Sequence, residues 1–182
     1  MKNPIVKAAL ALFAVAIFAA AAQAQHQPYA GQHERDIKAL SAEQIKQYLS
    51  GAGMGFAKSA ELNHYPGPMH ALELAGPLGL SPEQHAAVKA LMDAHKVQAR
   101  AIGAKLVESE RALEQLFRAG KLDGPTLASA VGTAAQLQGE YRLSHLETHR
   151  GTRALLTDEQ VSRYDALRGY AQQSGAHQNR TH

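Results

Sequence analysis

Histidine provides most of the side chains in this sequence that could carry chemistry. The 182 residues include ten histidines and four methionines but no cysteine. Without a thiol the chain has no disulfide and no cysteine nucleophile, so a metal site must be built from His, Met, Asp or Glu. His145 and His149 have the clearest spacing, because residues four apart on a helix share one face with Cβ atoms about 5–6 Å apart. Two such imidazoles can bind one ion at about 2.0–2.1 Å.

A long helix is predicted from Pro82 to about Ala119. Ser81 is an N-cap, Gln84 completes a capping box, and a proline at the first helical position loses no hydrogen bond. Gly120 supplies the C-cap. Along this stretch one row of positions has spacings that alternate between four and three residues: Val88, Met92, His95, Ala99, Ile102, Leu106, Ser109, Leu113 and Leu116. Such a heptad row is typical of a helix that packs along another helix.

A second long helix is predicted from about Thr126 to Leu155, after a turn at residues 121–125. Its best row has the same alternating spacing but more polar members: Leu127, Val131, Ala134, Gln138, Tyr141, His145, Thr148 and Thr152. Because the connection is short, the two helices are expected to form an antiparallel hairpin. If the turn centres on Leu122, residues at equal distances from it face one another.

This register brings the candidate metal ligands together. Counted outward from the turn, the facing pairs are Leu116 and Leu127, Leu113 and Val131, Ser109 and Ala134, Leu106 and Gln138, Ile102 and Tyr141, Ala99 and His145, His95 with Thr148 and His149, and Met92 and Thr152. The sequence therefore predicts one patch that holds His95, His145, His149 and Met92. Imidazole with an optional thioether suits copper, nickel, cobalt or zinc better than calcium or magnesium.

The alternative interpretation of these side chains is structural. A histidine in an apolar row is commonly a core residue with one hydrogen bond, and methionine commonly fills gaps in a core. His64 and His70, on either side of a Pro-Gly-Pro turn, could add a ligand, although no spacing rule places them. His177 and His182 near the C-terminus are expected to be solvated, with weak adventitious affinity for metal.

The first 24 residues are expected to be a cleaved secretory signal. Lys2 and Lys7 flank the start of an apolar run at residues 8–22, and residues 22–24, Ala-Gln-Ala, offer the small side chains that signal peptidase accepts. The run has 15 residues, short of the ~20 that span a bilayer, which argues against a retained anchor. We therefore expect a mature chain that starts at Gln25, in the periplasm and without stable insertion in the membrane.

Composition argues against other classes of function. Without Lys2 and Lys7, 17 basic residues stand against 16 acidic ones, whereas nucleic-acid binding needs a clustered basic surface. Ser109 lies in a helix without the Gly-x-Ser-x-Gly context of a nucleophile. The glycine-rich stretch at 51–55 does not follow a strand, as a phosphate-binding loop would. Neither nucleic-acid binding nor enzymatic activity is expected.

Shorter helices are expected to flank the hairpin. Before it, the stretches predicted to be helical are 41–49, 56–62 and 69–75. Ser41 and Gln44 form a capping box for the first, and Gly76-Pro77 is expected to end the last. A final helix is capped by Thr157. The fold class is therefore all-α, a long antiparallel helical hairpin with shorter flanking helices. The expected organisation is a flexible segment at 25–40, one helical domain at 41–172 and a disordered tail at 173–182.

Two short motifs resemble those of a known family. Residues 80–84, Leu-Ser-Pro-Glu-Gln, and 156–160, Leu-Thr-Asp-Glu-Gln, are similar to the paired L-T-x-x-Q motifs of the periplasmic Spy/CpxP family. Residues 40–44 form a looser third copy. The motif positions in the two main copies are Leu80, Ser81, Gln84, Leu156, Thr157 and Gln160. With the hairpin between them, the resemblance covers about residues 78–170.

The resemblance implies a small helical protein, often dimeric, that binds unfolded polypeptides or takes part in envelope-stress or heavy-metal responses. Its CnrX- and ZraP-like relatives bind metal through His, Glu or Met. The first interpretation is a chaperone-like homodimer in which Leu72, Leu74, Leu78 and Leu80 form a shallow client surface. The alternative is a metal-binding or metal-sensing protein that uses the histidine cluster and acts on an envelope signalling protein.

Overall fold

The computed structural model describes residues 29–120 and 122–170, and within them the chain is all-α, as the sequence predicts. A 3-10 turn at Gln32–Glu34 precedes seven α-helices in this part of the chain. Their bounds are α2 Ala42–Ser50, α3 Lys58–Glu61, α4 Pro68–Glu73, α5 Ala75–Leu78, α6 Pro82–Ala119, α7 Gly124–Leu155 and α8 Asp158–Leu167. The chain divides into two units, residues 1–38 and 39–182, and all seven helices belong to the second.

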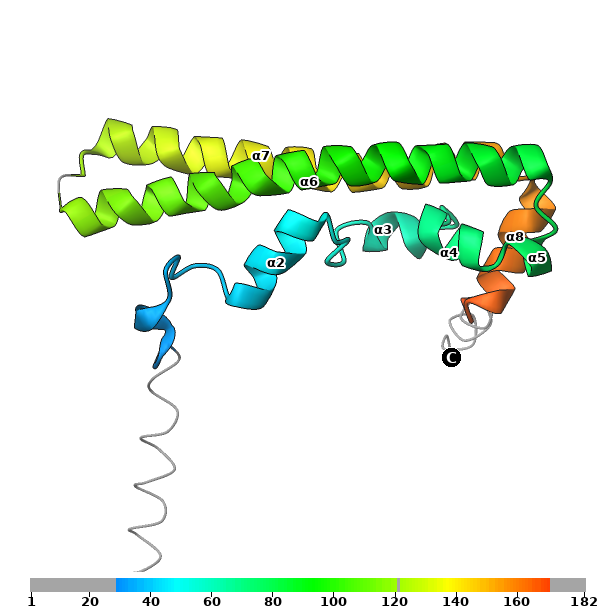
Figure 1. The fold of residues 1–182 in the computed structure, drawn as a ribbon, viewed down its shortest axis with the longest axis horizontal. Helices are drawn as coiled ribbons and strands as arrows, with labels where there is room; N and C mark the ends of the chain where they lie inside the picture. The colour runs from blue at the N-terminus through cyan, green and yellow to red at the C-terminus, as the bar shows by residue number, and fades with distance from the viewer. Residues whose placement is uncertain (1–28, 121, 171–182) are drawn as a thin grey trace, which may run out of the picture. The chain divides into compact units, whose positions relative to one another are not determined.

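Helices α6 and α7 form the predicted antiparallel hairpin and lie side by side along their length (Figure 1). α6 begins with the expected capping box, in which Ser81 Oγ accepts from the backbone N–H of Gln84 and the Gln84 side chain accepts from that of Ser81. It ends at Gly120, whose φ of 63° is left-handed and favours glycine. α7 begins two residues earlier than predicted, because the Asp123 carboxylate accepts from the N–H of Thr126 and caps the helix.

The segment before the hairpin lies along it as a series of short helices (Figure 1). α2 packs on α6, α3 packs on α7, and α4 contacts both long helices. α3 is shorter than the predicted stretch 56–62. The prediction that Gly76-Pro77 ends a helix is wrong, because Pro77 lies in the first turn of α5, where its missing N–H needs no partner.

The seam of α7 follows the predicted row except near the turn. The buried members of the row are Ala134, Tyr141, His145, Thr148 and Thr152. Val131 and Gln138, in the half of α7 nearer the turn, are exposed, although Ala134 between them is buried. The predicted pairing of Leu106 with Gln138 therefore does not bury both residues. Figure 1 shows the reason: α2, α3 and α4 lie along the part of the hairpin that is further from the turn.

Packing of α2 gives α6 a second buried face that the heptad row does not include. Gly103 and Val107 are buried beside the row. A Cβ on Gly103 would lie 2.1 Å from the backbone oxygen of Tyr48 and 3.2 Å from the ring of Tyr141. Glycine is therefore required for this close approach. The contact also sets the register, because Gly103 faces Tyr141 within one residue of the predicted pairing with Ile102.

The leucines that were expected to form a client surface are packed within the fold. The core cluster consists of Ala71, Leu78, Val88 and Tyr164, with Leu72, Leu74, Leu80, Leu155 and Tyr170 packed against it. Leu78 is only 1% exposed. Leu78 is therefore not available to a client, whereas Leu72, Leu74 and Leu80 are partly exposed and their part in a client surface stays a prediction.

The two L-T-x-x-Q-like motifs contact each other at the end of the hairpin opposite its turn. Gln84 Nε2 donates to Gln160 Oε1 at 2.8 Å, and Gln160 Nε2 donates to Gln84 Oε1 at 2.9 Å. The same two oxygens accept from the backbone N–H groups of Ser81 and Thr157. Each glutamine therefore caps its own helix and also binds the other, which joins the first turns of α6 and α8.

Some predictions concern residues outside the described ranges. They are the signal at 1–24, the start of the 25–40 segment, and the tail with His177 and His182. None of the helices in the described part of the chain combines the length and the apolar character that a bilayer crossing requires.

Candidate metal centre

A glycine-rich loop at residues 51–57 joins α2 to α3 beside the hairpin. The Tyr141 hydroxyl donates to the carbonyl of Ala52 at 2.7 Å and ties the loop to α7. Gly53 lies against His145, since a Cβ on this glycine would be 3.8 Å from the imidazole Cδ2. Met54 follows with a φ of 46°, a left-handed conformation that is strained for a residue with a side chain. The loop therefore places Met54, in a strained backbone conformation, next to Gly53, which packs against His145.

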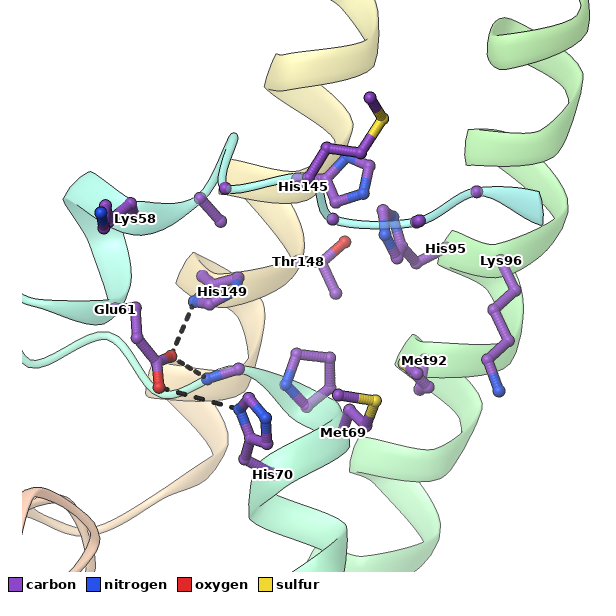
Figure 2. A pocket seen from close by; sticks show the side chains of 18 of the residues that line it. Lys58, Glu61, Met69, His70, Met92, His95, Lys96, His145, Thr148 and His149 are labelled. Atoms are coloured by element: carbon purple, nitrogen blue, oxygen red, sulfur yellow. Dashed lines mark hydrogen bonds and ion pairs between the residues drawn. The ribbon is translucent and has the colours of Figure 1, made fainter. Parts of the chain in front are cut away.

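A cavity of about 480 Å³ lies between this loop, α4 and the two long helices (Figure 2). Figure 2 shows Met92, His95 and Lys96 extending from α6, Thr148, His145 and His149 from α7, and Met69 and His70 from α4. Met54 and Glu61 also line the cavity. The structure thus brings together the four side chains that the register places in one patch. Their binding of metal stays a prediction.

His95 and His145 are the deeply buried imidazoles of this cavity, 8% and 5% exposed. Their rings meet edge to face, with centroids 4.5 Å apart. His145 Nδ1 lies 2.8 Å from the carbonyl oxygen of Tyr141, so Nδ1 carries the proton and Nε2 keeps its lone pair. Neither His145 Nε2 nor His95 Nδ1 has a hydrogen-bond partner of normal geometry among the described atoms. Two buried nitrogens therefore have hydrogen-bonding or coordinating capacity that the described residues leave unused.

The contact of His95 lies one helical turn from its predicted position. The register places His95 opposite Thr148 and His149, whereas its ring contacts His145. Side chains of paired helices insert between the turns of the facing helix and do not meet level with one another. The offset leaves all three histidines in the lining of the same cavity.

Burial keeps both imidazoles neutral near pH 7. It lowers the pKa of His95 to about 4, with smaller contributions from His145 and His149. Burial also lowers the pKa of His145, although nearby backbone groups, that of Tyr141 first, oppose the shift. A metal ion binds an unprotonated imidazole nitrogen. Neither ring therefore has to lose a proton before it can bind an ion at neutral pH.

His149 lies at the wall of the cavity, between α7 and residues 65–67. Its Nδ1 is 2.8 Å from the carbonyl oxygen of Tyr65 and 3.6 Å from Glu61 Oε2. A Cβ on Gly67 would lie 3.0 Å from Cε1 and 3.2 Å from Nε2 of the same ring. Because Gly67 has an ordinary φ of −77°, glycine is needed here for space and not for backbone conformation.

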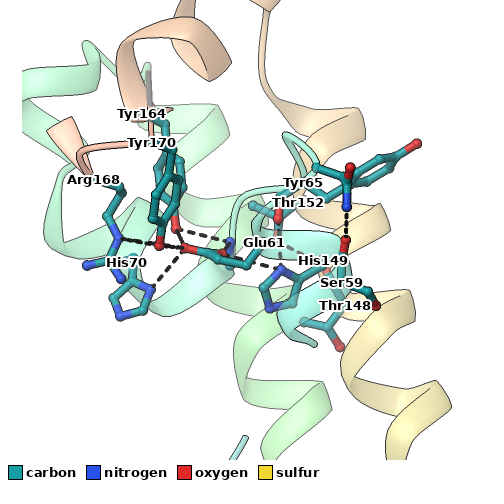
Figure 3. A network of polar contacts seen from close by, with 12 residues as sticks. Ser59, Glu61, Tyr65, His70, Thr148, His149, Thr152, Tyr164, Arg168 and Tyr170 are labelled. Carbon is teal, nitrogen blue, oxygen red and sulfur yellow. Dashed lines mark hydrogen bonds and ion pairs between the residues drawn. The ribbon is translucent and has the colours of Figure 1, made fainter. Parts of the chain in front are cut away.

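Glu61 connects this wall to the C-terminal part of the fold (Figure 3). Its carboxylate accepts from the hydroxyls of Tyr164 at 2.6 Å and Tyr170 at 3.0 Å, and from the N–H of Gly67 at 3.1 Å. Three nitrogen-bearing side chains lie 3.6–3.8 Å from it: His70, His149 and Arg168. Burial and the hydrogen bond to Glu61 raise the pKa of Tyr164, so its phenol remains a donor. The network holds residues 61–70 against the C-terminal segment.

The two histidines beside the Pro-Gly-Pro turn are placed differently. His70 lines the cavity, with Nδ1 3.8 Å from Glu61 Oε1. His64 does not line the cavity and pairs instead with the buried carboxylate of Asp165 on α8. Of the two, His70 is the one placed to add a ligand.

Met54, Met69 and Glu61 were not predicted from the sequence to lie at the site. The methionine count was a usable signal, because every methionine of the chain except Met1 lines this cavity. Loop and short-helix positions follow no spacing rule, so nothing in the sequence placed them. The role of Glu61 could not be predicted either, because its partners Tyr164 and Tyr170 follow it by 103 and 109 residues in the sequence.

The donor set fits a transition metal ion better than calcium or magnesium. Unprotonated imidazole and thioether suit the softer ions, whereas hard cations take clustered oxygen ligands. Within residues 29–120 and 122–170, no three His, Asp or Glu side chains are already grouped so that they could hold an ion. A bound ion would therefore complete its coordination only after a side chain of the lining, such as that of His149, changes rotamer.

Comparison with known protein families gives an independent result. A family model described as heavy-metal resistance matches residues 48–163. The chain belongs to this family. The heavy-metal resistance match runs from α2 into α8 and so includes the glycine-rich loop, both long helices and His95, His145, His149 and Met92. It confirms the resemblance that the paired motifs indicate. Searches of curated proteins and of solved structures gave no match.

Proposed function

We propose that this member of the heavy-metal resistance family binds a transition metal ion in the cavity between the glycine-rich loop and the hairpin. The observation that carries the proposal is the pair of buried nitrogens, His95 Nδ1 and His145 Nε2, neither of which has a hydrogen-bond partner of normal geometry among the described residues. Leaving a buried polar atom unpaired costs about 1–3 kcal/mol, and coordination of an ion would remove that cost. Binding of an ion would therefore offset the cost of burying these two nitrogens.

Each histidine has a distinct part in the proposed site. His145 would bind through Nε2, because its Nδ1–H is held by the carbonyl of Tyr141, which also fixes the plane of the ring. His95 would bind through Nδ1. His149, at the wall of the cavity, would join after a rotation of its side chain. A bound ion would cross-link α6 and α7 through His95 and His145.

The proposed place of action is the periplasm, to which the expected signal at 1–24 would deliver the chain. A chain without cysteine has no thiol to oxidise there. Metal binding would let the protein hold excess ions or report them to an envelope signalling protein. Both roles begin with the same binding step, which is what the experiment addresses.

The test is a titration of tag-free protein with Cu(II), Ni(II), Co(II) and Zn(II), repeated on His95→Ala and His145→Ala. We expect each substitution to weaken binding by about 10- to 100-fold. His85→Ala is the matched control, because His85 is exposed on the same helix and does not line the cavity. Replacing His177 and His182 in every protein removes the expected adventitious binding. Unchanged affinity in both cavity variants would exclude the site.

A second candidate function is the binding of non-native polypeptides by a homodimer. Exposed apolar side chains on the long helices favour it: Val97 at 72%, Phe117 at 60%, Leu143 at 55% and Val131 at 47%. The test is whether substoichiometric protein suppresses aggregation of a denatured client, with Phe117→Ser and Val131→Ser combined as the comparison. Equal suppression by this variant, or none by the wild type across several clients, would count against the candidate.

A further inference from the structure

We infer that the cavity selects a soft monovalent ion, Cu(I) or its redox-inert analogue Ag(I), and that Met54, Met69 and Met92 supply thioether ligands beside the two buried imidazoles. The inference rests on the proposed function and goes further by naming the class of ion. It depends on where the methionines lie, how they can move, and which charges surround them.

The methionines of the described chain are all in one place. Met54, Met69 and Met92 come from the glycine-rich loop, α4 and α6, and all three line the cavity. The core cluster around Leu78 and Tyr164 contains no methionine. Methionine that served as general filler would be expected in the core as well. Its concentration around two unpartnered imidazole nitrogens points to a shared ligand.

Each methionine is placed so that it can approach the imidazoles. Met92 precedes His95 by three residues on α6, so the two share a helix face. Met54 follows Gly53, which lies against His145. Met69, at the start of α4, is 48% exposed, so solvent borders its side chain and it can change rotamer. An unbranched side chain with three rotatable bonds can turn toward an ion without movement of the backbone.

The charges around the cavity favour a monovalent ion over a divalent one. Imidazole and thioether are neutral donors, and Lys58 and Lys96 add positive charge to the lining. The carboxylate in the lining is Glu61, whose oxygens already accept from two tyrosines and the N–H of Gly67. The cost of removing an ion from water rises steeply with its charge, so a divalent ion would lose more on entry. Thioether ligands also select Cu(I) among the common metal ions.

The experiment compares affinities for Cu(I), Ag(I) and Zn(II) in three proteins. They are the wild type, the triple variant Met54→Leu, Met69→Leu, Met92→Leu, and the double variant His95→Ala, His145→Ala. Cu(I) is titrated without oxygen against a coloured Cu(I) chelator. Leucine keeps the volume of methionine and leaves the imidazoles in place, so Zn(II) affinity of the triple variant reports whether its site is still folded. X-ray absorption at the copper edge shows whether sulfur coordinates the ion.

We expect the triple variant to lose at least about 100-fold in Cu(I) and Ag(I) affinity while its Zn(II) affinity changes by less than about threefold. Wild-type protein loaded with Cu(I) should show sulfur in its first coordination shell, and the triple variant should not.

Two results would overturn the inference and leave the proposed function standing. One is a triple variant that binds Cu(I) as tightly as the wild type while the double histidine variant does not. The other is wild-type protein that binds Zn(II) through His95 and His145 but shows no sulfur around copper. If the double histidine variant binds every ion as tightly as the wild type, the proposed function fails first, and the inference fails with it.

Discussion

At the scale of single residues, the arrangement of His145 shows how one hydrogen bond can assign roles to two ring nitrogens. The carbonyl of Tyr141 takes the proton-bearing Nδ1, and Nε2 is left buried beside the ring of His95. In a core without a ligand, both rings would be better replaced by apolar side chains of the same size. Their presence in a cavity lined by methionine is the reason, at this scale, to propose metal binding.

The first prediction concerns acid sensitivity of the metal-free protein. The folded state holds the pKa of His95 near 4, well below its ordinary value of 6.5. Between these two pH values the imidazole is protonated in the unfolded chain but neutral in the folded chain. The free energy of unfolding is therefore at its full value above about pH 6.5 and decreases as pH falls toward 4. We expect the free energy of unfolding to decrease by roughly 1–2 kcal/mol from this group between pH 7 and pH 5.

Urea unfolding at the two pH values, with a chelator present, measures this effect. His95→Gln should reduce the difference between pH 7 and pH 5, and the exposed His85→Gln should leave it unchanged. A wild-type protein that is equally stable at both pH values would show that His95 is not held neutral.

The candidate site was predictable from sequence where helices carry it and unpredictable where loops do. His95, His145, His149 and Met92 lie on two long helices, so spacing and a turn position were enough to bring them together. Met54 and Met69 lie on a glycine-rich loop and a six-residue helix, whose paths depend on contacts such as Tyr141 to Ala52. Those contacts arise only in the folded chain.

At the scale of elements, the paired glutamines explain why the sequence motif occurs twice. Each copy alone would cap a helix, as Ser41 and Gln44 do for α2. Together, Gln84 and Gln160 also bind each other and join α6 to α8. The duplication therefore serves a tertiary contact as well as two helix starts.

The second prediction is an energetic coupling between these two glutamines. Gln84→Ala and Gln160→Ala should each destabilise the protein, and the double variant should lose about 1 kcal/mol less than the sum, because the mutual hydrogen bonds can be lost only once. The measurement is a double-mutant cycle by urea unfolding. Gln44→Ala removes a cap of the same kind without the partner and is the control for helix capping.

Losses from Gln44→Ala and Gln84→Ala are expected to add, since Gln44 and Gln84 belong to different helix starts. Strict additivity between Gln84→Ala and Gln160→Ala would show that the contact contributes nothing beyond capping.

The third prediction concerns the approach of α2 to α6. Gly103→Ala should destabilise the protein by about 2–3 kcal/mol, because the new Cβ would overlap the backbone oxygen of Tyr48. Gly132→Ala is the matched control on α7, where a Cβ would meet nothing within 4 Å. It should stabilise the helix by about 0.5–1 kcal/mol. Thermal unfolding of the two variants compares them directly, and equal stability would mean that α2 does not pack as described.

Among the elements, strong local signals were read correctly and weak ones were not. α6 and α8 begin at caps, Ser81 and Thr157, that are visible in sequence and fix their starts. The start of α7 was predicted two residues too late, because its cap, Asp123, lies inside the predicted turn. Short helices such as α3 and α5 are held mainly by packing on neighbours. Pro77 illustrates the difference. It would end a helix that reached it from α4, but it is accommodated in the first turn of α5, which begins at Ala75.

At the scale of the whole molecule, the helices of residues 39–182 form an apolar core in one region and the candidate binding cavity in another. The core cluster at α4, α5, α6 and α8 is apolar and lies around Leu78 and Tyr164. The cavity lies between the glycine-rich loop, α4 and the middle of the hairpin, and contains the polar and sulfur-bearing side chains. Since the long helices bring His95 and His145 together, the hairpin register decides whether the site exists.

Binding of an ion by His95 and His145 is tested most directly by a crystal structure of the metal-loaded protein, with anomalous data collected at the absorption edge of the bound metal. One strong peak is expected in the cavity between α6 and α7, about 2.0–2.1 Å from both His95 Nδ1 and His145 Nε2. A strong peak elsewhere on the chain, with these two nitrogens still unliganded, would contradict it.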